Sequence, residues 1–351
     1  MKLLSHKHTG FRGLADNQYT LSDLNLVVGD NGIGKTSLLE AVYVSLLGTP
    51  LNSFNKAGKE LSREARGDFA VESTLVNGSG TELKLGFLSK KNIKKLTANG
   101  EKITTREAFL GTPVCLIDSN VEKISSESPD YRRRLVDRSV FHVEQKHAES
   151  YKRLQKAIKQ RNRSIKNGES EKTITSWDGI ISEEGERVTK HRNTFTAELQ
   201  EELKALNKQI STKIIKIEFK NGWGGERLFD YLEKNIRRDM AAKRTMGGPH
   251  RGDLLVTLDG KLAKEYSSKG EEKQMSLAVS FAISRLIEKK CGARPILLID
   301  ELESGLDETA LYRIADHIKN LKNQSLITTL KHHKIKDVLR GKTIHPNQHN
   351  Y

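Results

Sequence analysis

The pattern of hydrophobic and polar positions divides the 351-residue chain into three segments. In residues 1–125, short apolar runs such as Leu24–Val28 alternate with turn sequences, which is typical of strands in an α/β domain. In residues 126–245, apolar residues recur every three or four positions among many charged ones, which predicts helices. The α/β pattern returns in residues 246–351. We therefore predict one α/β domain built from the two outer segments, with a helical domain inserted between them.

The first segment contains three further predicted strands, at residues 70–76, 82–88 and 114–117. Asn77-Gly78 and Asn99-Gly100 are dipeptides typical of tight hairpin turns. We expect the chain from residue 88 to residue 106 to form a β-meander at the edge of this domain.

The middle segment predicts an antiparallel arm of two helices. The first apolar stripe runs from Tyr151 to Ile165 and ends at Asn167-Gly168, a helix stop. The second stripe begins at Ile181 and continues to Ile210. Helices of about 30–38 residues would each be about 45–57 Å long, which is far too short for a long coiled coil.

A glycine-rich loop lies between the predicted strand 24–28 and a predicted helix. Residues 29–36 fit G-x-x-x-x-G-K-[ST], a loop whose backbone N–H groups cradle phosphates at a helix N-terminus. Lys35 is expected to reach the β- and γ-phosphates of ATP, and the Thr36 hydroxyl is expected to hold Mg²⁺. The alternative is a chance glycine-rich turn, which the flanking strand and helix disfavour. The predicted nucleotide-binding residues are Gly29, Asp30, Asn31, Gly32, Ile33, Gly34, Lys35, Thr36 and Ser37.

A second apolar run, residues 295–299, ends in the acids Asp300 and Glu301. A buried strand whose carboxyl end opens onto the nucleotide would place both acids there. Asp300 is expected to bind in the Mg²⁺ shell, and Glu301 to orient or deprotonate the attacking water. The alternative is an ordinary core strand with an acidic end at the surface.

Two more motifs narrow the class of ATPase. Ser268 and Gly270 stand at the start of a predicted helix about thirty residues before Asp300, which is the placement of the signature sequence in ABC-type ATPases. In that class the signature binds the γ-phosphate of ATP held by the other protomer. The segment from Ser304 to Asp307 fits the dimer-contacting loop of the same class. We therefore expect ATP to join two copies of the chain as a homodimer.

Composition adds a preference for polyanions. Lys and Arg total 60 and Asp and Glu total 45, so the net charge is +15, which favours salt-dependent binding of phosphate polymers. Aromatic residues make up only 6%, so contact with a DNA backbone is expected rather than base stacking.

The sequence also excludes several classes. No apolar run approaches the ~20 residues that cross a bilayer, and no secretory signal is apparent. The two cysteines, Cys115 and Cys291, have no metal-binding spacing and are expected to be reduced. A cytoplasmic protein without membrane contact is predicted.

Nearly the whole chain resembles the RecF family, recombination-repair ATPases related to SMC and ABC heads. The resemblance rests on Phe11-Arg12, the phosphate loop, the signature, and above all the arginine-rich segment 129–137 and the Gly-Pro-His-Arg motif at 248–251. It implies an ABC/SMC-like P-loop ATPase head, formed by residues 1–125 and 246–351, with the inserted helical arm at 126–245.

The resemblance also implies a function. The chain would be a weak DNA-dependent ATPase that dimerises with ATP on double-stranded or gapped DNA. It would assist RecR and RecO in loading a recombinase, and slow hydrolysis would release it. Arg12 would approach the nucleotide or be a plain surface arginine. Four other residues would contact DNA or stabilise the fold: Arg132, Arg133, His250 and Arg251.

One departure from the family pattern bears on dimerisation. The family usually has glutamines after the signature glycine, where this chain has Glu271 and Glu272. Two carboxylates near a phosphate would weaken dimer closure unless they point away or pair with Lys269 and Lys273.

Several other functions fit parts of the pattern. A nucleotide kinase would share the phosphate loop but lacks such a signature and arm. A phage-defence nuclease with an ABC head would append an acidic metal-binding domain, and the sequence after Asp300 is Lys- and His-rich. Another ABC-headed DNA-maintenance ATPase remains an alternative. A scaffold with a dead site is disfavoured because Lys35, Asp300 and Glu301 are all present.

Overall fold

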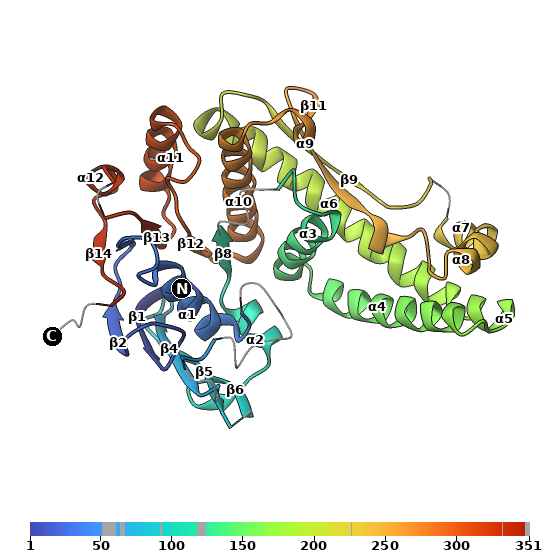
Figure 1. Ribbon diagram of the computed structural model, residues 1–351, viewed down its shortest axis with the longest axis horizontal. Helices are drawn as coiled ribbons and strands as arrows, with labels where there is room; N and C mark the ends of the chain where they lie inside the picture. The colour runs from blue at the N-terminus through green and yellow to red at the C-terminus, as the bar shows by residue number, and fades with distance from the viewer. Residues whose placement is uncertain are drawn as a thin grey trace. The chain divides into compact units, whose positions relative to one another are not determined.

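The computed structural model describes residues 1–50, 61–63, 67–91, 93–117, 124–225, 227–331 and 333–347, and the chain divides into two compact units. Unit 1 comprises residues 1–122, 208–211 and 268–351, and unit 2 comprises residues 123–207 and 212–267. Figure 1 shows the elements of both units in sequence colours.

A five-stranded parallel sheet forms the centre of unit 1. Its order is β14 (Lys342–Ile344), β3 (Leu24–Val28), β13 (Ser325–Thr329), β12 (Ile296–Ile299) and β8 (Val114–Ile117). All four neighbouring pairs are parallel. Strand β13 therefore lies between β3 and β12, and the carboxyl ends of these three strands meet at one edge of the sheet.

A second sheet of unit 1 is antiparallel. Its order is β2 (Asn17–Thr20), β1 (Lys2–Thr9), β4 (Phe69–Val76), β5 (Glu82–Lys90), β6 (Ile93–Ala98) and β7 (Glu101–Lys102). The last three strands are sequential antiparallel neighbours; Asn77-Gly78 lies between β4 and β5, and Asn99-Gly100 lies between β6 and β7. A short helix, α2 (Thr105–Gly111), follows it.

Helix α1 (Lys35–Leu47) is buried on nearly all sides and contacts β4, β5 and β13. A helix that is apolar around its whole circumference belongs in a core rather than on a surface. Three other helices complete unit 1: α10 (Lys269–Cys291), α11 (Glu308–Asn320) and α12 (Ile335–Leu339). Helix α10 packs on β8, where the Cys115 thiol lies 3.4 Å from the carbonyl oxygen of Ser280.

Unit 2 is mainly helical. Its longer helices are α3 (Pro129–Val143), α4 (Gln145–Lys166) and α6 (Asp178–Ile210), whose last residues belong to unit 1. The short helices are α5 (Glu171–Thr175), α7 (Leu228–Lys234), α8 (Ile236–Ala241), the 3-10 turn η2 (Pro249–Arg251) and α9 (Ala263–Tyr266). The 33 residues of α6 match the predicted length, and Asn167 caps α4 as expected. The first predicted long helix is instead two helices, because Glu144 adopts an extended conformation between α3 and α4.

A three-stranded sheet explains why unit 2 extends to Ser267. Strand β10 (Asp253–Leu258) pairs along its whole length with β9 (Ile215–Lys220) and also with β11 (Lys261–Leu262). Because β9 belongs to the inserted segment, this pairing holds residues 246–267 in unit 2, whereas the sequence pattern assigns them to the other domain.

Fully buried ion pairs connect the elements of unit 2. The Arg161 guanidinium donates to Asp178 at 2.7 Å and to Asp239 at 2.6 Å, and none of the three side chains is more than 2% exposed. The Arg192 guanidinium binds both carboxylate oxygens of Asp137. Within the described part of the chain, no helix has the length and apolar character that spanning a membrane requires.

Candidate nucleotide-binding site

The phosphate loop connects β3 to α1 and depends on its glycines. Gly34 precedes the helix with φ of 102°, a left-handed conformation that side chains rarely adopt. A Cβ atom there would lie 2.6 Å from Leu14 Cδ2, and one at Gly29 would lie 2.5 Å from Ile33 Cγ2. A larger side chain at either position would require Ile33 or Leu14 to move, and at Gly34 it would also strain the backbone.

Lys35 places its ammonium group inside this loop. Its Nζ atom donates to the carbonyl oxygens of Gly29 at 2.9 Å and Asp30 at 3.0 Å, and the residue is 6% exposed. A buried positive charge at the N-terminus of α1 adds to the helix dipole. The loop therefore fits an anionic phosphate chain.

Thr36 and Asp300 meet across the parallel sheet. The Thr36 hydroxyl lies 2.9 and 3.1 Å from the two carboxylate oxygens of Asp300, which directly follows β12. A hydroxyl and a carboxylate oxygen are the hard ligands that Mg²⁺ prefers, with phosphate and water supplying the others. This pair fits the metal that the sequence predicts.

Thr328 links the two acids Asp300 and Glu301, which are here called the acidic corner. The sequence analysis assigned no role to this residue. Its hydroxyl donates to Asp300 Oδ1 at 2.7 Å and accepts from the backbone N–H of Glu301 at 2.7 Å. The residue is fully buried on β13. Only the strand order, which places β13 between β3 and β12, brings this hydroxyl to both acids.

Glu301 has a constrained backbone. Its φ is 47°, a left-handed value that costs a non-glycine residue on the order of 1 kcal/mol. Besides the contact with Thr328, its carbonyl oxygen accepts from Nζ of Lys273 at 3.2 Å. Because Lys273 lies on α10 and is 1% exposed, a buried ammonium connects the signature helix to the acidic pair.

The signature residues Ser268 and Gly270 lie at the N-terminus of α10. Ser268 caps the helix, and the Glu271 carboxylate in turn accepts from the Ser268 backbone N–H at 2.8 Å. Glu271 therefore folds back onto its own helix end. A Cβ atom on Gly270 would lie 2.9 Å from the carbonyl oxygen of Gly305, so the signature packs closely on the segment that contains Ser304.

Asp307, an expected dimer contact, caps α11. Its carboxylate accepts from the backbone N–H of Ala310 at 2.8 Å. Ser304 donates its backbone N–H to the Glu301 carbonyl oxygen at 3.1 Å, so this loop begins at the acidic corner.

Arg12 forms an ion pair with Glu40 of α1 at 2.5 Å. Its backbone N–H also donates to the carbonyl oxygen of Leu61 at 2.7 Å, and its φ is 44°. The side chain is 39% exposed, so it is anchored to the helix that follows the phosphate loop and still contacts solvent.

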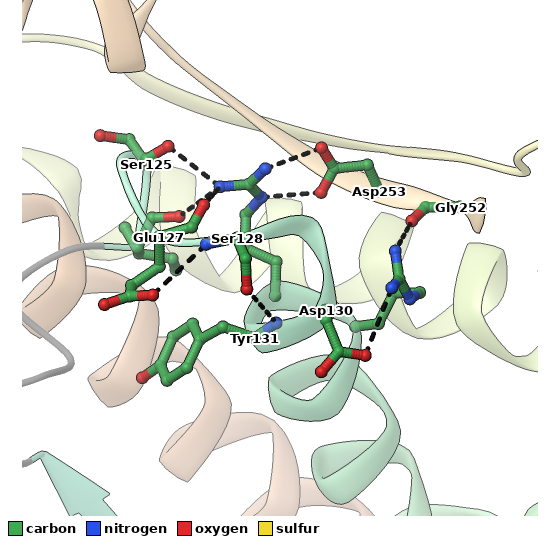
Figure 2. A network of polar contacts seen from close by, with 10 residues as sticks. Ser125, Glu127, Ser128, Asp130, Tyr131, Gly252 and Asp253 are labelled. Carbon is green, nitrogen blue, oxygen red and sulfur yellow. Dashed lines mark hydrogen bonds and ion pairs between the residues drawn. The ribbon is translucent and has the colours of Figure 1, made fainter. Parts of the chain in front are cut away.

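In unit 2, the structure gives Arg132 and Arg133 partners within the protein. Arg132 donates to both oxygens of Asp253 and to the carbonyl oxygens of Ser125 and Glu127 (Figure 2). Arg133 donates to the carbonyl oxygen of Gly252 at 2.6 Å and also pairs with Asp130. These contacts support a stabilising role for Arg132, whose side chain is 6% exposed.

The Gly-Pro-His-Arg turn is closely packed. His250 Nε2 lies 3.1 Å from the carbonyl oxygen of Thr245, and burial lowers the pKa of His250 to about 4, so the ring is neutral at pH 7. Arg251 donates weakly to the same carbonyl at 3.4 Å and stays exposed. The neutral, packed His250 is suited to structure rather than to phosphate binding.

Three comparisons show which known proteins this chain resembles. Residues 24–329 match the family model described as AAA domain, putative AbiEii toxin, Type IV TA system. The DNA replication and repair protein RecF of Coxiella burnetii is 30% identical over 337 residues, which cover 95% of this chain and 94% of that protein. A solved structure of the recombination mediator protein RecF-ATP in the RecFOR pathway has a TM-score of 0.83 at 25% identity, covering 93% of this chain and 91% of that one.

The fold also resembles that of an Smc head bound to the C-winged helix domain of ScpA. The TM-score is 0.60 at 16% identity, with 97% of this chain and 91% of that one covered. These similarities confirm the predicted fold class, a P-loop ATPase head of the SMC kind with an inserted helical part.

Proposed function

Because this chain belongs to the RecF family of DNA replication and repair proteins, we propose that it is an ATP-binding protein of recombinational DNA repair that hydrolyses ATP. The observation that carries the proposal is the Thr36–Asp300 pair at the mouth of the phosphate loop, with Glu301 beside it. This arrangement joins a phosphate cradle, two metal ligands and a candidate base at one edge of a parallel sheet.

Each residue of the site has a role in the proposed chemistry. Lys35 neutralises phosphate charge, while Thr36 and Asp300 hold Mg²⁺, which when bound stabilises the negative charge on the phosphates. Glu301 orients or deprotonates the attacking water. Thr328 positions both acids, since its hydroxyl contacts the Asp300 carboxylate and the Glu301 backbone.

ATP-dependent homodimerisation on DNA is the second part of the proposal. Ser268 and Gly270 of one copy would bind the γ-phosphate held by the other, with Ser304 and Asp307 near the contact. The Glu271 carboxylate already accepts from the Ser268 N–H, so a phosphate must compete with it, and weak, DNA-dependent hydrolysis is consistent with such a site. By family resemblance, double-stranded or gapped DNA, RecR and RecO are the proposed partners.

A solution-mass measurement tests the dimer. The Glu301→Gln variant should bind ATP without hydrolysing it, so ATP should raise its dimer fraction on duplex or gapped DNA. The Lys35→Ala variant should lose this response. If ATP increases neither dimer nor DNA occupancy in Glu301→Gln, the proposed clamp mechanism is wrong.

The Ser268→Arg variant separates binding in one copy from binding in its partner. An arginine at this position should leave ATP binding intact and prevent dimerisation. If Ser268→Arg dimerises with ATP as the unmodified chain does, the signature does not act across the dimer.

A further inference from the structure

The exposed face of α4 carries a stripe of positive charge. Its members, here called the α4 basic stripe, are Lys152, Lys156, Lys159, Arg163 and Lys166, and all five are exposed. They recur at steps of four, three, four and three residues, so they lie within an arc of about 80° on the helix. The buried residues of α4, such as Leu154 and Ile165, lie on the opposite side.

None of the five cations forms an ion pair within the part of the chain that the structure describes. The neighbouring Arg153, by contrast, pairs with Glu184 at 3.2 Å. The only acid on the exposed face of α4 is Glu149, which lies one turn before the stripe. The stripe is therefore of a single sign along its whole length.

Like charges three and four residues apart repel and weaken a helix. A solvated helix face ordinarily avoids this by alternating signs, and α6 does so: Glu183 pairs with Arg187, and Glu201 with Lys204. Helix α4 instead keeps five like-charged residues that form four consecutive neighbouring pairs. Such repulsion is relieved when a polyanion lies along the face.

We propose that the α4 basic stripe binds the phosphate backbone of duplex DNA. The stripe spans about 21 Å, since 14 residues separate its ends at 1.5 Å each, and a DNA strand places a phosphate every 3.4 Å or so of helix axis. No large hydrophobic side chain on α4 is exposed among the described residues. Protein interfaces have an apolar or aromatic centre, whereas backbone contact needs only cations.

This inference rests on the proposed function, because it names the surface through which a repair ATPase would contact DNA. It assigns the contact to α4 rather than to Arg132, which is occupied by Asp253. Contacts between these cations and backbone phosphates do not depend on the DNA sequence, so they would give affinity without base readout.

The test compares two variants that each remove five positive charges. In the first, all five stripe residues become Gln. In the control, five exposed lysines of unit 2 outside α4 become Gln: Lys172, Lys190, Lys216, Lys243 and Lys264. Both variants change the net charge from +15 to +10, so they differ only in where the charge is removed.

The measurement is binding of a duplex of about 30 base pairs without nucleotide, across a range of salt concentrations. Because the stripe variant has no cations to neutralise about five phosphates, its slope of log affinity against log salt should be shallower by about 4 to 5. Between 50 and 200 mM salt, binding by the unmodified chain should then weaken about 500-fold more than binding by that variant. The control should keep most of its slope.

Equal slopes in the two variants would overturn the proposal. The stripe would then bind an acidic protein or only face solvent. Circular dichroism verifies folding, and two smaller variants, Lys152→Gln with Lys156→Gln and Arg163→Gln with Lys166→Gln, should each reduce the slope by about 2. Because no ATP is present, failure of ATP-driven dimerisation cannot produce the same result. The dimerisation assay on the stripe variant, run separately, reports on the proposed function alone.

Discussion

Substituting Thr328 by Val tests how the acidic corner is held together. The change keeps the shape of the side chain but removes the hydroxyl that bridges Asp300 and Glu301. A hydrogen bond to a charged group contributes about 1.5–3 kcal/mol, and a buried N–H left without a partner costs about 1–3 kcal/mol. Since both contacts are 2.7 Å and Thr328 is fully buried, we expect a loss of about 3 kcal/mol in the free energy of unfolding.

The neighbouring Thr329 provides a matched control. It lies on the same strand and is also fully buried, but its hydroxyl has no hydrogen-bond partner among the residues that the structure describes. The Thr329→Val variant should therefore be neutral or slightly stabilised. The Thr328→Ser variant keeps the hydroxyl and should lose only about 1 kcal/mol for one methyl group.

Urea unfolding followed by far-UV circular dichroism measures the stabilities, and ATP turnover measures the effect on chemistry. Thr328→Val should lower turnover more than it lowers ATP affinity, because Lys35 and the loop remain in place while both acids lose their alignment. Equal destabilisation of the Val variants at 328 and 329 would refute the reasoning, as would unchanged turnover in Thr328→Val.

Three further predictions concern other buried groups. Replacing Arg161 by Met should destabilise unit 2 by about 3–5 kcal/mol in urea unfolding, because two buried aspartates lose their common partner. Adding Asp178→Asn should recover part of this loss of stability. No recovery would contradict the pairing. A maleimide should label the exposed Cys291 in the native protein and Cys115 only after unfolding, since Cys115 is buried and burial raises the pKa of its thiol to about 12; mass spectrometry of two native labels would disprove this. Burial lowers the pKa of His250 to about 4 in the folded protein. As the pH falls, the unfolded chain therefore protonates this histidine first, and the free energy of unfolding should decrease between about pH 6.5 and pH 4. His250→Gln should flatten this part of the pH profile, and an unchanged profile would exclude His250 as its source.

The sequence predicted the parts of the site that are local. The phosphate loop, its strand and its helix are contiguous, and the motif itself places glycine at positions 29 and 34, where a Cβ atom would lie within 2.6 Å of Ile33 or Leu14. The acids at 300 and 301 follow an apolar run, so their position at a strand end was also readable. The two Asn-Gly dipeptides each lie at a hairpin turn, between β4 and β5 and between β6 and β7, because turn chemistry acts over a few residues.

Contacts between distant residues required the fold. Arg132 and Asp253 are 121 positions apart, and no local pattern relates them. The pairing of β9 with β10 likewise holds residues 246–267 in unit 2, although their apolar pattern resembles the other domain. A strand pattern reports that a strand exists and which face is buried, but not which neighbour it will pair with.

Helix length shows the same division. The apolar stripe from Tyr151 to Ile165 was expected to belong to a helix of about 30–38 residues, yet α4 has 22 residues because Glu144 separates it from α3. The sequence by itself thus determined the class of protein, the phosphate loop and the acidic pair, each encoded within a few neighbouring residues. Only the tertiary structure decided that β13 lies between β3 and β12, and so brought the Thr328 hydroxyl to Asp300 and Glu301, because strand order depends on packing across the whole sheet.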